Sequence, residues 1–267
     1  IMMMRRPQCG RRDQDEAARL SFAHAEAVPF FHPEGGLPKL WLFDMDDTLL
    51  ASSAGILDEV HELMNAYLIG QLGMSEVEAN RLRELYWREC GSTFIGLWRH
   101  HGVDPRDFLP AVHDFDYGPY IEGLPNIRRL LARFPGRRAL LTNGPESYVS
   151  RILPALGLGG FFDAVVTSTD MRLFGDWRPK PSVPMLLAVC ARMGVRPGEA
   201  ALVDDGLINL RAAKRAGLRT VWCVGLRMRH AGLRPPFGTP MAHAAADLVV
   251  RDVRELSRRI GRLRRTS

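Results

Sequence analysis

The sequence predicts an α/β protein in which a doubly wound parallel sheet is interrupted by an inserted helical module. A short apolar run at residues 40–43 has the character of a buried strand, and residues 57–112 then show helical periodicity without a strand. After Gly123, helical and strand patterns alternate. Strands separated by helices form parallel sheets covered on both faces, so the later strands are expected to complete the sheet that the first one begins.

The first expected element is the strand Leu40-Trp41-Leu42-Phe43. Residues 1–37 alternate charged clusters with proline and glycine and have no sustained periodicity, so we expect a disordered N-terminal extension there. The apolar strand runs directly into acidic residues, as a buried parallel strand does at its functional end.

Residues 53–119 are expected to form the helical module. Ser75 followed by Glu78 is the sequence of a capping box, and Asp104-Pro105 supplies an N-cap and a first-turn proline. The positions expected to face inward are Leu57, Val60, Met64, Tyr67, Phe94, Leu97, Trp98, Phe108 and Val112.

Residues 38–52 and 120–250 are expected to form the sheet-containing core. Each later strand should follow a helix, and Pro154 should kink one of these helices. The expected pairs of helix and strand are 125–134 with 138–142, 146–157 with 162–166, 183–194 with 200–203, and 207–216 with 220–224.

The net charge of +6 is concentrated at the C-terminal end of the chain. Residues 226–267 hold ten arginines and three acidic residues, a balance of +7, whereas the body of the chain is slightly acidic. Residues 251–267 therefore predict a basic C-terminal helix or tail. Two interpretations stay open: an amphipathic helix docked on the sheet through Val253, Leu256, Ile260 and Leu263, or an arginine-rich segment that binds nucleic acid.

Composition narrows the class of protein. No apolar run reaches the roughly 18 residues that a membrane-spanning helix needs, so no membrane partner is expected. Cys9, Cys90, Cys190 and Cys223 lack metal-ligand spacing, and the N-terminus does not have the pattern of a secretory signal. We expect reduced thiols, a cytoplasmic location and no obligate protein partner.

Polar residues follow three of the expected strands. Ligands of parallel sheets bind beyond the carboxyl ends of the strands, where these residues should converge. Lys180 lies in a loop before another helix. The candidate site residues are Asp44, Asp46, Thr142, Asn143, Lys180, Asp204 and Asp205.

The chemistry of these residues favours phosphoryl transfer. Several carboxylates at one edge would repel each other and a phosphate, and a divalent cation resolves both problems; Mg²⁺ prefers such oxygen ligands. A lysine can neutralise phosphoryl oxygens, and a hydroxyl with backbone amides can complete a phosphate cradle. Asp44 and Asp46 point the same way in an extended segment, so one can attack phosphorus and the other can transfer protons.

The segment Asp44-Met45-Asp46-Asp47-Thr48-Leu49 resembles the first signature of the haloacid dehalogenase superfamily, and Thr142, Lys180 and Asp204-Asp205 match the next three in order. The resemblance covers residues 39–225. It implies a Rossmann-like core with a type-1 cap and a Mg²⁺-dependent phosphatase that works through an aspartyl-phosphate.

The resemblance also implies the roles of the site residues. Asp44 would be the nucleophile and a metal ligand, and Asp46 the general acid/base whose backbone carbonyl also binds metal. Thr142 and Lys180 would hold phosphate, while Asp205, with Asp204, would hold Mg²⁺. Asn143 is either a phosphate ligand or a turn residue, Asp204 either a ligand or a partner of one, and Asp47 is expected to cap the turn. Asn209 could orient Asp205.

A narrower resemblance concerns the substrate. Residues 86–93, Gly96-Leu97 and 113–115 are similar to the cap of pyrimidine 5′-nucleotidase-like members, although Cys90 and Gly206 depart from that pattern. The expected partner is a small phosphorylated metabolite, a nucleoside 5′-monophosphate by this resemblance. The alternatives are a phosphoglycolate or sugar-phosphate phosphatase and, in another class, a nucleic-acid-associated binding protein that uses the basic tail; the acidic site makes nucleic acid the lesser expectation.

Overall fold

The structure, a computed structural model, describes residues 36–121, 123–232, 244 and 246–263, which belong to the second of the chain's two units, Pro33–Ser267. The predicted N-terminal extension lies outside the described residues, except for Gly36 and Leu37. The last four residues of the predicted basic tail, 264–267, also lie outside them.

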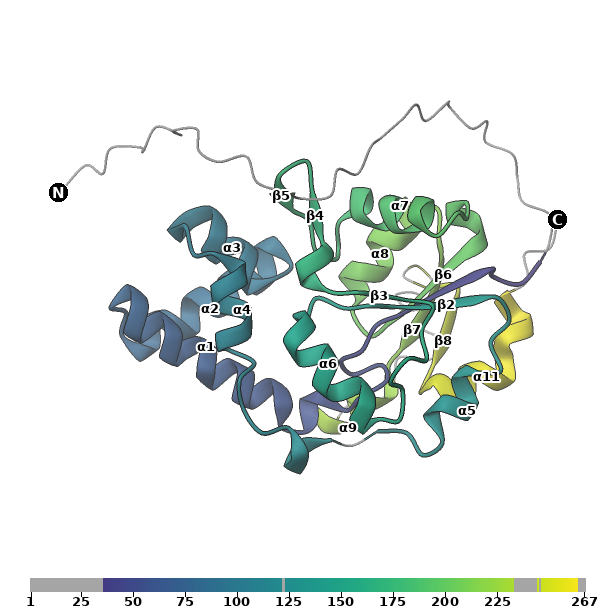
Figure 1. Cartoon of the computed structure of the whole chain (residues 1–267), viewed down its shortest axis with the longest axis horizontal. Coiled ribbons are helices and arrows are strands. Elements are labelled where there is room, and N and C mark those ends of the chain that lie inside the picture. The colour runs from purple at the N-terminus through teal and green to yellow at the C-terminus, as the bar shows by residue number, and fades with distance from the viewer. Residues whose placement is uncertain (1–35, 122, 233–243, 245, 264–267) are drawn as a thin grey trace. The chain divides into compact units, whose positions relative to one another are not determined.

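A six-stranded sheet forms the centre of the core, and every pair of neighbouring strands in it is parallel (Figure 1). The strand order is β3-β2-β1-β6-β7-β8, which places β1 between β2 and β6. The predicted doubly wound α/β class is confirmed. The strands are β1 (Leu40–Phe43), β2 (Arg137–Leu141), β3 (Ala164–Val166), β6 (Ala200–Asp204), β7 (Arg219–Cys223) and β8 (Leu248–Val250).

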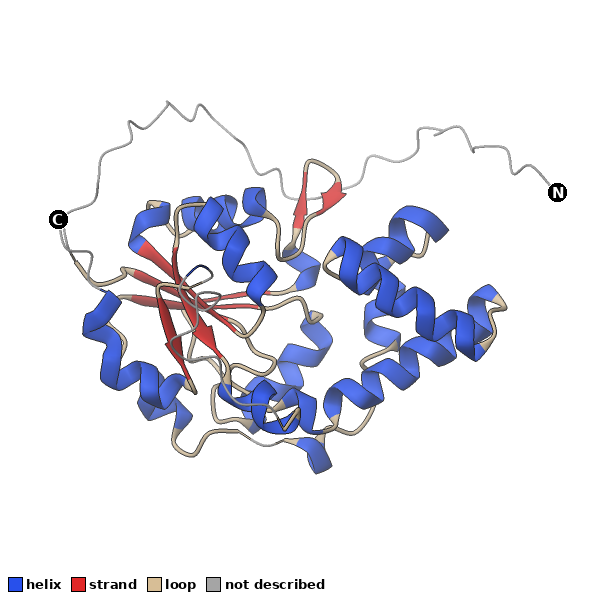
Figure 2. Cartoon of the chain, turned by 180° about the vertical axis from the view of Figure 1, so that it is seen from behind, coloured by secondary structure: helices blue, strands red, loops and turns tan. Residues whose placement is uncertain are grey.

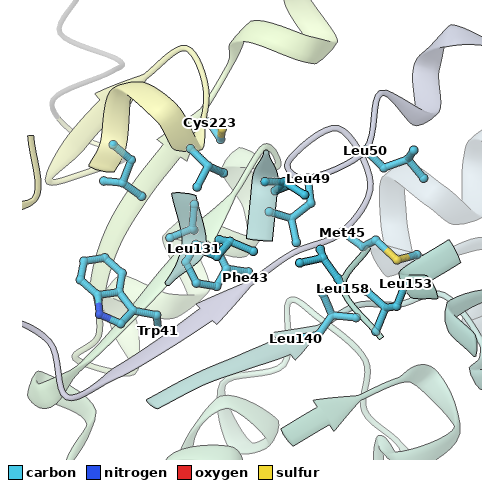
Figure 3. Packing of buried hydrophobic residues seen from close by; sticks show 14 of the residues in the cluster. Trp41, Phe43, Met45, Leu49, Leu50, Leu131, Leu140, Leu153, Leu158 and Cys223 are labelled. Atoms are coloured by element: carbon cyan, nitrogen blue, oxygen red, sulfur yellow. The ribbon is translucent and has the colours of Figure 1, made fainter. Parts of the chain in front are cut away.

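Strand β1 is buried on both faces, as its uninterrupted apolar sequence predicts. Trp41 and Phe43 enter the hydrophobic cluster on one face of the sheet, and Leu40 and Leu42 enter the cluster on the other. Figure 3 shows Trp41 and Phe43 among the side chains of the first cluster. The Trp41 ring also meets the Phe134 ring edge to face, with ring centroids 4.8 Å apart. The strand that carries the first acids is therefore anchored in both halves of the core.

Helices cover the two faces of the sheet (Figure 2). The cluster of Trp41 and Phe43 includes residues of α5 (Ile127–Leu131), α6 (Glu146–Ala155) and α11 (Val253–Arg259). The opposite cluster includes residues of α7 (Val183–Arg192) and α8 (Leu207–Arg215).

The inserted helices lie between β1 and β2 and are called the helical cap below. They are α1 (Ile56–Leu72), α2 (Glu76–Cys90), α3 (Thr93–His101) and α4 (Pro105–Ala111).

The cap has a hydrophobic cluster of its own, in which Phe94 and Phe108 are buried. Ser75 and Glu78 form the predicted capping box, and the Asp104 side chain accepts a hydrogen bond from the backbone of Arg106 as the predicted N-cap. Trp177 of strand β5 (Asp176–Trp177) joins the cap cluster, so the cap packs on the core at that point.

Several short elements were not expected from the sequence. In the hairpin of β4 (Arg172–Leu173) and β5 (Asp176–Trp177), the turn residues Phe174 and Gly175 both have positive φ, and phenylalanine rarely signals such a turn. The predicted helix 125–134 is shorter, because Asn126 has φ of 60° and α5 begins only after it.

Other short elements complete the described fold. The remaining ones are α9 (Gly225–His230) and the 3₁₀ turns η1 (Ser52–Ala54), η2 (Gly118–Tyr120), η3 (Ser168–Asp170), η4 (Pro197–Glu199) and η5 (Ile260–Leu263). No helix among the described residues combines the length and the apolar character needed to cross a membrane.

Helix α11 is docked on the sheet, as one of the two interpretations of the basic tail predicts. Val253 and Leu256 are fully buried, and Leu263 beyond the helix is also buried in the same cluster. Arg258, in contrast, is exposed. The apolar face of this segment therefore belongs to the core.

We expect Leu256→Ala to lower the free energy of unfolding by about 2–4 kcal/mol, because it removes a fully buried side chain and leaves a cavity. Urea denaturation followed by circular dichroism measures this. The control Arg258→Ala, on the same helix, should change stability by less than about 0.5 kcal/mol. Equal stability of the two variants would contradict the docking of α11.

Candidate active site

Three neighbouring strands deliver polar residues to one edge of the sheet. Asp44 directly follows β1, Thr142 directly follows β2, and Asp204 is the last residue of β6. Phe43 is paired in register with residues of both β2 and β6, so the three strands end side by side. After β1 the chain builds the sheet first in one direction and then, from β6, in the other, which is the arrangement that opens a crevice in such sheets.

A buried lysine joins two of the acids. The Lys180 ammonium nitrogen lies 2.7 Å from Asp44 Oδ1 and 2.7 Å from Asp204 Oδ2, and only 2% of the side chain is exposed. Burial alone would lower the pKa of Lys180, but the contacts with Asp204 and Asp44 outweigh it and raise that pKa, so the ammonium stays charged. The lysine predicted to meet phosphate is thus held at the ends of β1 and β6.

Asn143 fixes the loop that carries this lysine. Its side-chain oxygen accepts a hydrogen bond from the Lys180 backbone N–H at 2.9 Å, and its amide nitrogen donates to the Lys180 carbonyl at 3.0 Å. The structure therefore places Asn143 on the Lys180 backbone, a role that neither sequence interpretation included. Thr142 Oγ1 accepts a hydrogen bond from the Gly144 N–H at 3.0 Å, which leaves its own hydroxyl proton available.

Three carboxylates can share one cation. Asp44, Asp204 and Asp205 each offer an oxygen, and these oxygens lie within 4.8 Å of one another. All three side chains are largely buried, and hard divalent cations prefer this donor set. The residues present therefore fit a cation such as Mg²⁺.

The three carboxylates differ in how many hydrogen bonds and ion pairs they already form with the protein. Asp204 Oδ1 accepts hydrogen bonds from Gly206 N–H and Asn209 Nδ2, and its Oδ2 contacts Lys180. Asn209, in the first turn of α8, was expected to be able to orient Asp205, but its amide donates to Asp204 at the end of β6 instead. Asp205 Oδ2 lies 3.1 Å from a guanidinium nitrogen of Arg227 on α9. Asp44 and Asp205 thus keep more free oxygen capacity than Asp204.

Burial and mutual repulsion raise the pKa values of Asp44 and Asp205. Burial is the largest cause that raises the pKa of Asp44 well above its usual value, with Lys180 opposing it and the neighbouring acids adding to it. Burial also raises the pKa of Asp205 to about 7, supported by Asp204 and opposed by Arg227. Concentrating negative charge here is costly without a cation.

Asp46 points to a different set of partners. Its Oδ1 accepts hydrogen bonds from the hydroxyl groups of Ser52 and Tyr148, the latter at 2.7 Å. Burial raises the pKa of Asp46, and these two hydrogen bonds oppose the increase. Asp47 Oδ1 accepts from the Ser53 N–H at 2.9 Å, which confirms its predicted role in the turn.

The residues gathered at this edge of the sheet lie within the part of the chain that matches a known protein family. A family model described as haloacid dehalogenase-like hydrolase matches residues 38–217, more than half of the sequence and all of the clustered site residues. The chain belongs to the haloacid dehalogenase-like hydrolase family. It is an enzyme of the hydrolase class.

Two curated relatives of this hydrolase are named as phosphatases of small phosphorylated molecules. Phosphoglycolate phosphatase 1 of Pseudomonas aeruginosa is 29% identical over 243 residues, which cover 86% of this chain and 82% of that protein. Glyceraldehyde 3-phosphate phosphatase of Methanopyrus kandleri is 31% identical over 198 residues, which cover 68% of this chain and 82% of that protein.

A solved structure shares the fold of the hydrolase. The HAD phosphatase from Thermococcus onnurineus aligns with a TM-score of 0.55 and 24% identity, covering 85% of this chain and all of that one. At this level of identity the likeness concerns the fold alone.

The sequence did not point to the contacts of Ser52, Tyr148 and Arg227 with the site acids. Ser52 follows Asp46 by six residues, but its approach depends on the 3₁₀ turn that brings it back. Tyr148 is 102 residues away along the chain and Arg227 lies on an unexpected helix. The only sequence signal for Tyr148 is its place in the first turn of the helix that follows Thr142-Asn143-Gly144.

A neutral histidine lies beside Tyr148 in the hydrolase. His113 follows α4, its Nδ1 lies 2.8 Å from the Leu109 carbonyl oxygen, and its ring centroid is 5.2 Å from that of Tyr148. Burial lowers the pKa of His113 to about 4, opposed by the hydrogen bond to Leu109. His113 is therefore neutral near pH 7 and donates from Nδ1.

We expect His113 to make the hydrolase less stable in acid. The folded-state pKa of about 4 lies below the unfolded value of about 6.5, so stability is full above pH 6.5 and falls as the pH drops toward 4, by at most about 3 kcal/mol. In His113→Asn the amide can replace the Nδ1 donor without titrating. Urea denaturation at pH 7.5 and pH 4.5 should show a smaller loss for the variant than for the wild type; equal losses would contradict the assignment.

Proposed function

We propose that this hydrolase is a Mg²⁺-dependent phosphatase that removes phosphate from phosphoglycolate or a small sugar phosphate. The observation that carries the proposal is the buried group of Asp44, Lys180 and Asp204, with Asp205 beside it, at the rim of the sheet. It combines a nucleophile, a fixed cation for phosphoryl oxygens and a place for a divalent ion. The names of the two curated relatives support the substrate class.

In the proposed mechanism, an Asp44 carboxylate oxygen attacks phosphorus and forms an aspartyl-phosphate. The bond from phosphorus to the ester oxygen breaks, and Asp46 gives that oxygen a proton. Asp46 then takes a proton from the water that attacks the phosphorus of the intermediate, which releases phosphate and restores the Asp44 carboxylate. Lys180 and the Thr142 hydroxyl hold the transferred oxygens, where negative charge accumulates.

Asp44, Asp205 and the backbone carbonyl of Asp46 would hold Mg²⁺, with Asp204 as the partner of Lys180. When bound, the ion supplies positive charge that screens the acids from each other and from the phosphate. Asn143 contributes through the backbone of Lys180, because its two hydrogen bonds keep the ammonium directed at the same edge.

A small cavity lies between cap and core, apart from the clustered acids and Lys180. It measures about 250 Å³ and lies between α4 of the cap, the start of α6 and β5. Leu109 and Trp177 line it together with Arg106 and Ser147. None of Asp44, Asp46, Thr142, Lys180, Asp204 and Asp205 lines it, so its volume does not bear on the size of the leaving group.

Three of the residues that resemble nucleotidase-like caps, Tyr86, Thr93 and Leu97, are buried inside the cap. Tyr86 is buried, with its hydroxyl 2.9 Å from His101 Nε2, and Gly96 lies so close to the Tyr86 ring that a Cβ there would clash. The Thr93 hydroxyl donates to the Arg83 carbonyl at 3.2 Å, and Leu97 is fully buried. These positions support the packing of the cap. Trp87 of the same pattern is exposed, and Gly91 lies so close to Pro181, next to Lys180, that a Cβ there would clash, so this part of the pattern borders the candidate site.

Asp44→Asn should lower kcat by roughly 10⁴-fold or more, because the amide cannot form the covalent intermediate. Malachite-green detection of phosphate release measures this, and circular dichroism checks the fold. Asp47→Asn is the matched control: Asp47 has φ of 53°, which asparagine tolerates, and its side chain serves the turn. Turnover by Asp44→Asn at the level of the control would overturn the role of Asp44.

A substrate panel tests the proposed class. With Mg²⁺, kcat/KM should be at least about tenfold higher for phosphoglycolate or glyceraldehyde 3-phosphate than for uridine or cytidine 5′-monophosphate, a difference of about 1.4 kcal/mol in transition-state binding. Chelation of the metal should abolish release. A preference for the nucleotides would reject the small-substrate proposal and favour the nucleotidase prediction.

A further inference from the structure

The two oxygens of the Asp46 carboxylate have different surroundings. Oδ1 accepts hydrogen bonds from both the Ser52 hydroxyl and the Tyr148 hydroxyl. Within the described part of the chain, no hydrogen bond reaches Oδ2. A carboxylate held by one oxygen through two donors has a fixed orientation, and the other oxygen is left to react.

Tyr148 is itself held firmly. Its side chain is 1% exposed, and its ring is packed between His113 and Tyr117, with ring centroids 5.2 Å and 5.1 Å away. Tyr117 is held in turn by the Arg151 guanidinium, 4.6 Å from its ring centre, and by the hydrogen bond that its hydroxyl donates to the His113 carbonyl. The Tyr148 hydroxyl therefore has little freedom to leave Asp46.

The two donors come from different parts of the chain. Ser52 begins the 3₁₀ turn η1, in the first segment that connects core and cap. Tyr148 lies on α6 of the core, and the rings that pack on it belong to the second connecting segment, residues 112–126. The two segments also meet directly, because Leu50 and Gly123 form an antiparallel bridge.

We propose that Tyr148, with Ser52, is a positioning residue that holds Oδ1 of Asp46 so that Oδ2 faces the oxygen of the leaving group. The inference rests on the proposed phosphatase activity. As the bond from phosphorus to the ester oxygen breaks, the proton on Oδ2 moves to that oxygen, and the negative charge left on Asp46 is stabilised by the two hydroxyl donors on Oδ1. Fixed orientation and stabilised charge both lower the barrier of this step.

The effect of losing the Tyr148 hydroxyl should depend on the leaving group of the substrate. An alkoxide leaves only when it is protonated, so its departure depends on Asp46. The p-nitrophenolate ion is stable without a proton, so p-nitrophenyl phosphate can be cleaved with a poorly placed acid. A loss of positioning should therefore slow alkyl phosphates selectively, whereas general damage to the fold should slow both substrates alike.

Tyr148→Phe tests this, because it removes only the hydroxyl and keeps the packed ring. We expect kcat/KM to fall about tenfold for glyceraldehyde 3-phosphate and by less than about twofold for p-nitrophenyl phosphate. Tyr120→Phe is the matched control, since the Tyr120 hydroxyl also donates to a carboxylate oxygen, Glu59 Oε1, at 2.7 Å. It should change neither value by more than about twofold.

Equal losses for the two substrates, or no loss for the alkyl phosphate, would overturn the proposal. Should Tyr148→Phe fail to fold by circular dichroism, Ser52→Ala must show the same selective loss, because Ser52 binds the same oxygen. The aryl substrate separates this result from the activity itself. Cleavage of p-nitrophenyl phosphate by all variants with no selective loss rejects the positioning role alone, whereas inactivity of the wild type on both substrates rejects the phosphatase and the inference with it.

Discussion

The ion pairs of Lys180 with Asp44 and Asp204 are the constraint on which the site depends. A buried ammonium is costly unless hydrogen-bonded carboxylates surround it, and here the ends of two adjacent strands supply them. The parallel register of β1 with β6 places these acids next to each other, and Asn143 at the end of β2 holds the backbone of the lysine. Removing Lys180 would leave two buried carboxylates without their shared cation, so the loop and three strands form one unit.

Much of this arrangement could be predicted from the sequence, because local patterns determine it. The apolar run of β1 ends at Asp44, and parallel strands direct their carboxyl ends to a common edge, so convergence of the acids followed from strand assignment alone. The capping residues Ser75 and Asp104 likewise predict where two helices start, because N-cap hydrogen bonds involve only neighbouring residues. The resemblance to a known family added the roles, and the family match confirmed the membership.

The remaining features depend on contacts that sequence patterns do not encode. The sequence indicates a phosphate ligand or a turn residue at Asn143, but the partner of its side chain is the backbone of Lys180, 37 residues away. Tyr148 sits at a helical position that packing could explain equally well, and only the folded chain shows its hydroxyl at Asp46. The hairpin of β4 and β5 has no clear sequence pattern, because its strands have two residues each and its turn uses Phe174 at positive φ.

The two segments that connect core and cap also determine the surroundings of the Asp46 carboxylate. Ser52 in one segment binds the Asp46 carboxylate, and the rings of the other segment support the second donor to the same atom. Grafting a foreign cap onto this core at positions that replace these segments would therefore alter the acid as well as the selectivity. Chimeras joined inside α1 and α4, which preserve both crossings, are the ones in which a new specificity can be combined with the existing chemistry.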